Sequence, residues 1–131
     1  MIAADTSSLI AYLAGAPGAD VEILDAALRD QQVCLPPVVT TELLSAPDLP
    51  KEVAARLLEL PMLQVTDGYW ERAGALRARC LAAKRRARLG DSLIAQSCLD
   101  HKVHLITRDR DFQLFARSAG LRITTPADPR P

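Results

Sequence analysis

Four acidic side chains, far apart in the sequence, occupy positions from which they could gather into one metal-binding pocket. Asp5 ends a short apolar segment, and Asp109 closely follows the most apolar one. Glu42 and Asp91 each share a helical face with apolar residues, so we expect both to lie on core-facing stripes. Clustered carboxylates repel one another, and a hard cation such as Mg²⁺, or Mn²⁺ in its place, relieves that repulsion. Such a site can activate water for attack on a phosphodiester.

Each of these acids also has an ordinary structural role that the sequence leaves open. Asp5, Asp91 and Asp109 lie near expected helix starts and could be N-caps. Glu42 could lie exposed at an edge. The metal chemistry gives a reason for all four to act together, whereas each signal alone is weak.

Short apolar segments alternate with helical patterns, and this alternation predicts the elements that position the acids. Strands are expected at 2–5, 33–35, 63–65, 103–107 and 121–124, and helices at 9–14, 19–31, 37–46, 51–60, 67–86, 90–102 and 110–118. The order predicts an α/β fold with a short, mostly parallel sheet and helices on both faces. Ligands of such sheets bind beyond the carboxyl ends of the strands, where the acids can converge.

Length and composition fit one ordinary globular domain. The chain has 131 residues, and we assign residues 1–125 to the domain and 126–131 to a loose tail. Sixteen basic residues balance sixteen acidic ones, which argues against a protein that coats nucleic acid through its overall charge. Cys34, Cys80 and Cys98 are expected to be reduced and buried. The sequence shows neither a signal peptide nor an apolar run of membrane-spanning length, so we expect a cytoplasmic protein without a membrane anchor.

Four segments in this order resemble the PIN-domain family, particularly the VapC-type toxin ribonucleases of bacterial toxin–antitoxin pairs. They are IAADTSSLI, LPPVVTTELL, GDSLIAQSCLDHKVHLITRDRDF and the final RI, with TRDRDF (107–112) the most specific. The resemblance implies a PIN-like three-layer fold and a metal-dependent endoribonuclease. It also implies that Asp5, Glu42, Asp91 and Asp109 bind Mg²⁺ or Mn²⁺, that Thr6 or Ser7 and Thr107 support the metal's water shell, and that Asp111 is an outer acid or a cap. Whether Asp109 or Asp111 is the fourth metal ligand stays open.

Basic residues close to the acids could hold the phosphates of an RNA substrate. Arg85, Arg86 and Arg88 precede Asp91, and Arg108 precedes Asp109. An acidic pocket repels phosphates, so neighbouring cations are needed to hold RNA. A solvated helix end explains the cluster before Asp91 equally well.

The partners come from the resemblance, which implies an antitoxin segment in an apolar groove of the N-terminal half and a homodimer. The residues of this apolar half are Val21, Ile23, Leu24, Leu28, Leu43, Leu44, Leu57 and Leu58. Each of them alone is better explained as ordinary core. We also expect Tyr69 and Trp70 to pack between helices.

Two other functions compete with an endoribonuclease toxin. A PIN-like module could bind RNA or a protein without cutting. A phosphate-handling enzyme could use Asp5 as a nucleophile, but no second acid stands two positions after it and no partner lysine is evident. We therefore rank the phosphate-handling enzyme last.

Overall fold

The strands form one parallel sheet with β1 and β3 in its centre. A computed structural model describes residues 1–124 and contains four strands in the order β2-β1-β3-β4, all paired in parallel. Their bounds are β1 Ile2–Ala4, β2 Val33–Cys34, β3 His104–Ile106 and β4 Ile123–Thr124. In the central pair, Ala3 lies opposite Leu105. The predicted parallel α/β fold is confirmed.

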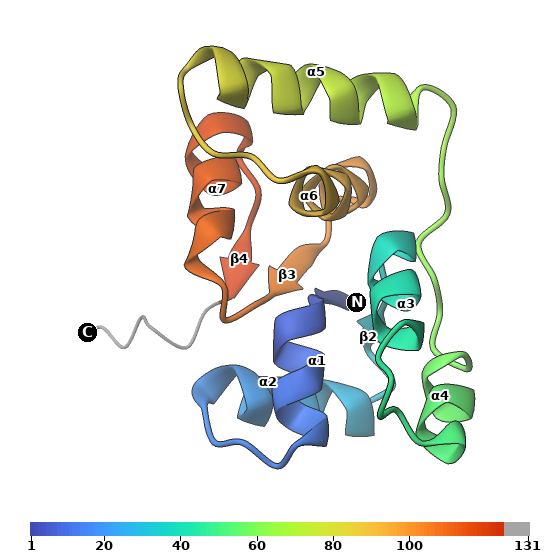
Figure 1. The fold of residues 1–131 in the computed structure, drawn as a ribbon. Coiled ribbons are helices and arrows are strands. Elements are labelled where there is room, and N and C mark those ends of the chain that lie inside the picture. The colour runs from blue at the N-terminus through green and yellow to red at the C-terminus, as the bar shows by residue number, and fades with distance from the viewer. Residues whose placement is uncertain (125–131) are drawn as a thin grey trace.

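Helices cover both faces of this sheet (Figure 1). They are α1 Thr6–Leu13, α2 Ala19–Arg29, α3 Pro37–Leu44, α4 Lys51–Leu57, α5 Tyr69–Ala82, α6 Leu89–His101, the 3₁₀ helix η1 Arg110–Phe112 and α7 Gln113–Ala119. Figure 1 shows α1 and α2 below the sheet, α5, α6 and α7 above it, and α3 and α4 beyond β2. Among residues 1–124, no helix combines the length and the apolar character that crossing a membrane requires.

The core is built from small residues in β1 and larger aliphatic residues around it. Ala3 and Ala4 are completely buried, as are Leu105 and Ile106 on the neighbouring strand. A strand that is buried on both faces is expected to be apolar throughout, which these segments are. The three cysteines are free and buried, as predicted. The central strands are therefore fixed from both sides by packing.

Two predicted elements differ from the structure. No strand forms at 63–65, because the pairing there is limited to an isolated bridge between Leu35 and Met62. The helix predicted to run to residue 86 ends at Ala82, and Lys84 takes a left-handed backbone conformation with a φ of 58°. The basic residues that follow therefore lie in a loop between α5 and α6. The tail predicted at 126–131 lies outside the described residues.

The apolar half of the chain is mainly core. Leu24, Leu43 and Leu57 are buried, whereas Leu44 and Leu58 are exposed, at 46% and 57%. The remaining three residues of that set, Val21, Ile23 and Leu28, are partly buried. Tyr69 is buried as predicted, but the prediction for Trp70 is wrong, because its side chain is 61% exposed.

Candidate active site

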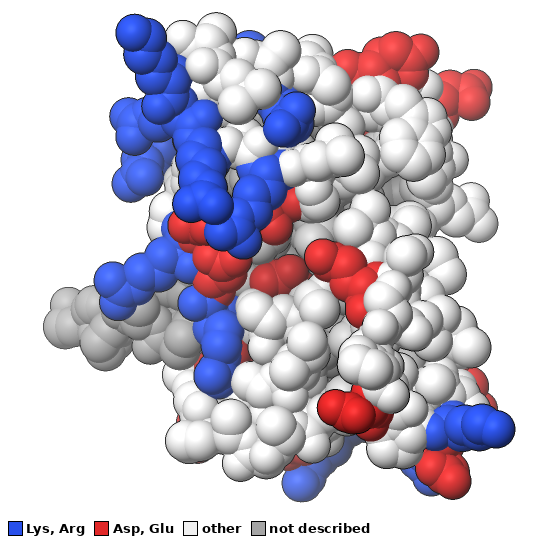
Figure 2. Space-filling view, viewed as in Figure 1, with Lys and Arg blue, Asp and Glu red and all other residues white. Residues whose placement is uncertain are grey.

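The sheet has a topological switch point between β1 and β3. The chain leaves β1 toward β2 on one side, and leaves β3 toward β4 on the other. Connections that diverge in this way open a crevice at the carboxyl ends of the two strands. Asp5 directly follows β1, and Thr107 directly follows β3. In Figure 2, carboxylates line a hollow near the centre of this face, with basic side chains beside them.

Asp5 is held in the crevice by two hydroxyl groups. Its residue is only 4% exposed, and Ser7 Oγ and Thr107 Oγ1 each donate a hydrogen bond of 2.7 Å to its Oδ2 atom. Asp5 stands at the N-cap position of α1 but makes no side-chain capping hydrogen bond. Burial raises the pKa of this carboxyl, although the two hydroxyls act in the opposite direction. Both hydroxyl bonds converge on Oδ2, so Oδ1 receives neither of them.

Thr107 also connects Asp5 to Asp109. Its fully buried Oγ1 atom accepts a hydrogen bond of 3.0 Å from the backbone N–H of Asp109. Asp109 in turn accepts a hydrogen bond of 2.9 Å on Oδ1 from the backbone N–H of Asp111. Asp109 is therefore the N-cap of η1, as one of the alternatives predicted, and it still belongs to the acidic group.

Asp91 lies in the first turn of α6 and faces the other acids. Its carboxylate, with those of Asp109 and Asp111, offers three oxygens that all lie within 4.8 Å of one another. Burial raises the pKa of Asp91 to about 6, and the charges of Asp109 and Asp5 act in the same direction. Closely spaced carboxylate oxygens are the ligands that Mg²⁺ and Mn²⁺ prefer. The donor set of this site therefore fits a hard divalent cation.

Glu42 reaches the site from α3, but not from a core-facing stripe as predicted. The residue is exposed, and the adjacent Leu43 takes the buried direction instead. Thr6 Oγ1 donates a hydrogen bond of 2.6 Å to Glu42 Oε1. A Cβ atom on Gly90 would lie 3.8 Å from Glu42 Oε2, which places the carboxylate beside the start of α6. Glu42 therefore stands at the rim of the hollow, near Asp91.

We expect Asp91→Asn to stabilise the metal-free protein. A pKa of about 6 in place of the usual 3.8 means that ionised Asp91 opposes folding. The effect at neutral pH is about 3 kcal/mol before solvent screening and about 1–2 kcal/mol after it. Because the folded-state pKa is raised, the penalty is absent below about pH 4, grows as the pH rises toward about 6 and is constant above it. Urea unfolding in EDTA at both ends of this range measures it.

The control for this variant is Asp30→Asn, which removes an exposed carboxylate just after α2. It should leave the free energy of unfolding almost unchanged at either pH. A loss of stability in Asp91→Asn at neutral pH would contradict the proposed repulsion among the acids.

A second set of contacts fixes the turn that carries Asp109. Arg108 donates from Nε to Asp20 Oδ2 at 2.8 Å and from an Nη atom to Asp20 Oδ1 at 2.9 Å. Asp20 is completely buried, and Ser8 Oγ also donates to it, at 2.8 Å. Burial opposes ionisation here, but the hydrogen bonds from Arg108 and Ser8 lower the pKa of Asp20 overall. The guanidinium predicted to hold RNA is thus engaged within the protein.

Gly18 makes this contact possible. Its φ is +149°, and a Cβ atom there would lie 2.6 Å from Asp20 Oδ1 and 2.7 Å from Arg108 Nη2. The sequence does not predict this network, because Pro17-Gly18 indicates only a turn and nothing local shows that Arg108 and Asp20 meet beside it. Its effect is to join α2 to the residue that precedes Asp109.

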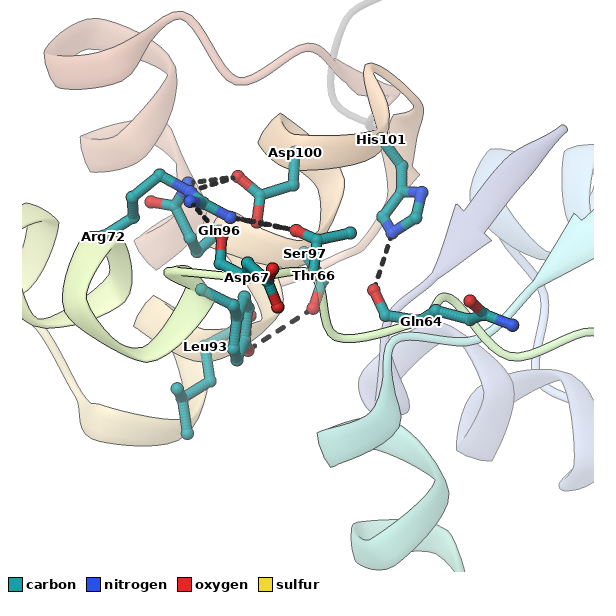
Figure 3. A network of polar contacts seen from close by, with 10 residues as sticks. Gln64, Thr66, Asp67, Arg72, Leu93, Gln96, Ser97, Asp100 and His101 are labelled. Carbon is teal, nitrogen blue, oxygen red and sulfur yellow. Dashed lines mark hydrogen bonds and ion pairs between the residues drawn. The ribbon is translucent and has the colours of Figure 1, made fainter.

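A third network orients α6, the helix that carries Asp91 (Figure 3). Arg72 of α5 donates to both carboxylate oxygens of Asp100, at 3.0 and 2.7 Å, and Gln96 donates to the same carboxylate at 2.8 Å. Tyr69 donates at 2.7 Å to the carbonyl oxygen of Leu93. These bonds join the start of α5 to α6 at Leu93 and at Asp100. They hold the helix in the orientation that brings Asp91 to the site.

Comparisons with known proteins agree with this architecture. The family model of the PIN domain matches residues 2–118. Comparison of the sequence with curated proteins gives no match.

Solved structures with the same fold come from complexes. A chain of VapBC2 from Rickettsia felis, bound to a DNA fragment from its promoter, is 18% identical with a TM-score of 0.72, over 95% of this chain and 98% of that one. A chain of FitAB bound to an IR36 DNA fragment is 17% identical with a TM-score of 0.75, and the match covers 100% of this chain and 99% of that one. A chain of VapBC-5 from Mycobacterium tuberculosis is 24% identical with a TM-score of 0.64, over 95% and 97%.

Proposed function

The chain belongs to the PIN domain family, and from that premise we propose that it is a Mg²⁺-dependent endoribonuclease, the toxin of a type II toxin–antitoxin pair. The observation that carries the proposal is the group of closely spaced carboxylate oxygens from Asp91, Asp109 and Asp111, with the buried Asp5 beside it at the switch point of the sheet. Burial and mutual repulsion raise the pKa of Asp91 to about 6. Ionised Asp91 therefore destabilises the fold, and a bound cation would offset this destabilisation.

The residues divide into those that hold the metal and those that orient the ligands. We assign Asp5, Asp91 and Asp109 to the metal, with Glu42 added from the rim. Thr6 orients Glu42, and Ser7 and Thr107 orient Asp5, through the hydrogen bonds described above. Asp111 is assigned to the outer edge of the acidic group. When bound, Mg²⁺, or Mn²⁺ in its place, supplies an activated water and neutralises charge on the phosphate.

Substrate and partners follow the same proposal. Arg85, Arg86 and Arg88 are exposed beside the acids and can hold RNA phosphates. The toxin–antitoxin systems among the similar structures support an antitoxin partner. A homodimer in the cytoplasm completes the proposal, as the family resemblance implies. Exposed apolar residues Ile10, Leu13, Leu44 and Leu58 on α1, α3 and the end of α4 offer an antitoxin a surface to cover.

Incubation with total RNA tests the function directly. We expect cleavage in Mg²⁺ or Mn²⁺ and none in EDTA, and mapping of the new ends should show whether one RNA or many are cut. The metal is required because the carboxylates alone repel the phosphate that must enter. RNA that stays intact with either metal would reject the proposal.

A PIN-like module that binds without cutting is the second candidate. The feature that favours it is that Asp5 and Glu42 both lie outside the closely spaced oxygens of Asp91, Asp109 and Asp111. Calorimetry with Mn²⁺ separates the two functions, because a nuclease binds the metal and a binding module does not.

A further inference from the structure

A small basic pocket adjoins the acidic hollow. Its volume is about 190 Å³, and it is lined by Arg85 and Arg86 of the α5–α6 loop, Arg110 and Asp111 of η1, and Leu114 and Arg117 of α7. Figure 2 shows basic side chains gathered on this side of the carboxylates, over α7 and the α5–α6 loop. Four guanidinium groups share the pocket with one carboxylate, so its lining carries a clear excess of positive charge.

These guanidinium groups are not engaged elsewhere in the part of the chain that the structure describes. Within residues 1–124, the three ion pairs join Arg29 to Asp25, Arg72 to Asp100 and Arg108 to Asp20. None of the four pocket arginines takes part in them. Like charges held this close together repel one another, and an anion placed among them would relieve that repulsion.

The chemistry of the lining indicates what that anion is. Guanidinium groups match the oxygens of phosphate through paired N–H donors. The pocket is smaller than the roughly 300–1,000 Å³ typical of sites for drug-sized ligands. Its lining contains Leu114 but no aromatic residue on which a base could stack. A phosphate group therefore fits better than a nucleobase.

Asp111 places the basic pocket next to the acidic site. Its side chain lines the pocket, and one of its carboxylate oxygens lies within 4.8 Å of oxygens of Asp91 and Asp109. If the scissile phosphate of a nucleic-acid strand enters the acidic hollow, a neighbouring phosphate of that strand would lie toward the arginines.

We propose that Arg85, Arg86, Arg110 and Arg117 form a subsite for a phosphate that flanks the cleaved linkage of a single-stranded nucleic acid. This inference rests on the proposed nuclease function for the position of the cleaved linkage. It replaces Arg108 by Arg110 and Arg117 in the set that contacts substrate. Recognition is by charge and not by base, so the subsite holds RNA and DNA strands equally.

Binding of a short fluorescein-labelled single-stranded RNA in EDTA tests the subsite without any cleavage. We expect the Arg110→Gln/Arg117→Gln variant to bind about tenfold more weakly or worse. The slope of log K against log salt should fall by about 0.7 for each phosphate that the variant no longer binds. A DNA strand of the same sequence should show the same two changes.

The matched control is Arg29→Gln/Arg56→Gln, which removes two arginines from α2 and α4, away from the pocket. The subsite is rejected if the pocket variant binds both strands with the affinity and salt slope of this control. Thermal unfolding of both variants establishes that they are folded.

Cleavage then separates this inference from the proposed function. If the wild-type protein cuts RNA, the pocket variant should show a raised KM, and a single neutral methylphosphonate beside the cleaved linkage should raise the wild-type KM in the same way. If the wild-type protein binds through the arginines but never cuts, the proposed function fails while the phosphate subsite stands. If it cuts and the pocket variant has an unchanged KM, the subsite fails while the function stands.

Discussion

Asp5→Asn is expected to abolish Mg²⁺-dependent RNA cleavage while leaving the fold intact. The asparagine has the shape of aspartate, and its carbonyl oxygen can accept the hydrogen bonds from Ser7 and Thr107 that now reach Oδ2. What is lost is a negative charge at the carboxyl end of β1. Metal catalysis contributes several kcal/mol, and a loss of about 4 kcal/mol corresponds to about 10³-fold in rate.

Single-turnover cleavage of a defined RNA and urea unfolding give the two readouts. Because burial raises the pKa of Asp5, the variant should be at least as stable as the wild type without metal. Asp30→Asn serves as the control and should cut at the wild-type rate. The assignment of Asp5 fails if its variant cuts within about threefold of the wild type.

Arg108→Gln is expected to produce the largest loss of stability. It leaves the carboxylate of Asp20 completely buried with only the Ser8 hydroxyl as a side-chain partner. Removing one partner of a buried ion pair costs about 3–5 kcal/mol, and the lower end applies because the Arg108 side chain is 33% exposed. Asp20→Asn should cost less, because the guanidinium that it leaves can turn toward water.

The double variant identifies the cause of this loss. Arg108→Gln combined with Asp20→Asn should be more stable than Arg108→Gln alone, since no buried charge is left without a partner. The pKa of Asp20 is lowered in the folded protein, so its contribution is present at neutral pH and is lost as the pH falls through that lowered value. Equal stabilities of the double variant and Arg108→Gln would contradict this account.

Strand ends were the part of the site that the sequence could predict. Parallel strands bring their carboxyl ends to one edge, so Asp5 and Asp109 could be placed together from the pattern alone. Glu42 could not be placed so well, because consecutive residues on a helix differ by about 100° in direction. Leu43, and not Glu42, points into the core.

Contacts between segments that are far apart in the sequence could not be predicted from the sequence. Arg108 and Arg110 alternate along the same turn, and nothing local indicates which one meets Asp20 on α2. The structure pairs Arg108 with it across 88 positions and places Arg110 in the basic pocket. The end of α5 was also predicted wrongly. The basic residues after Ala82 continue the helical pattern, but the left-handed backbone conformation of Lys84 ends the helix.

The bond between Asp5 and Thr107 joins residues 102 positions apart, each directly after one of the two central strands. A ribosome makes the chain from its N-terminus, so Asp5 exists long before the residues that complete its surroundings. Pairing across such a separation is also slow to form. The site that we propose is therefore incomplete until Thr107 has been synthesised and β3 has paired with β1.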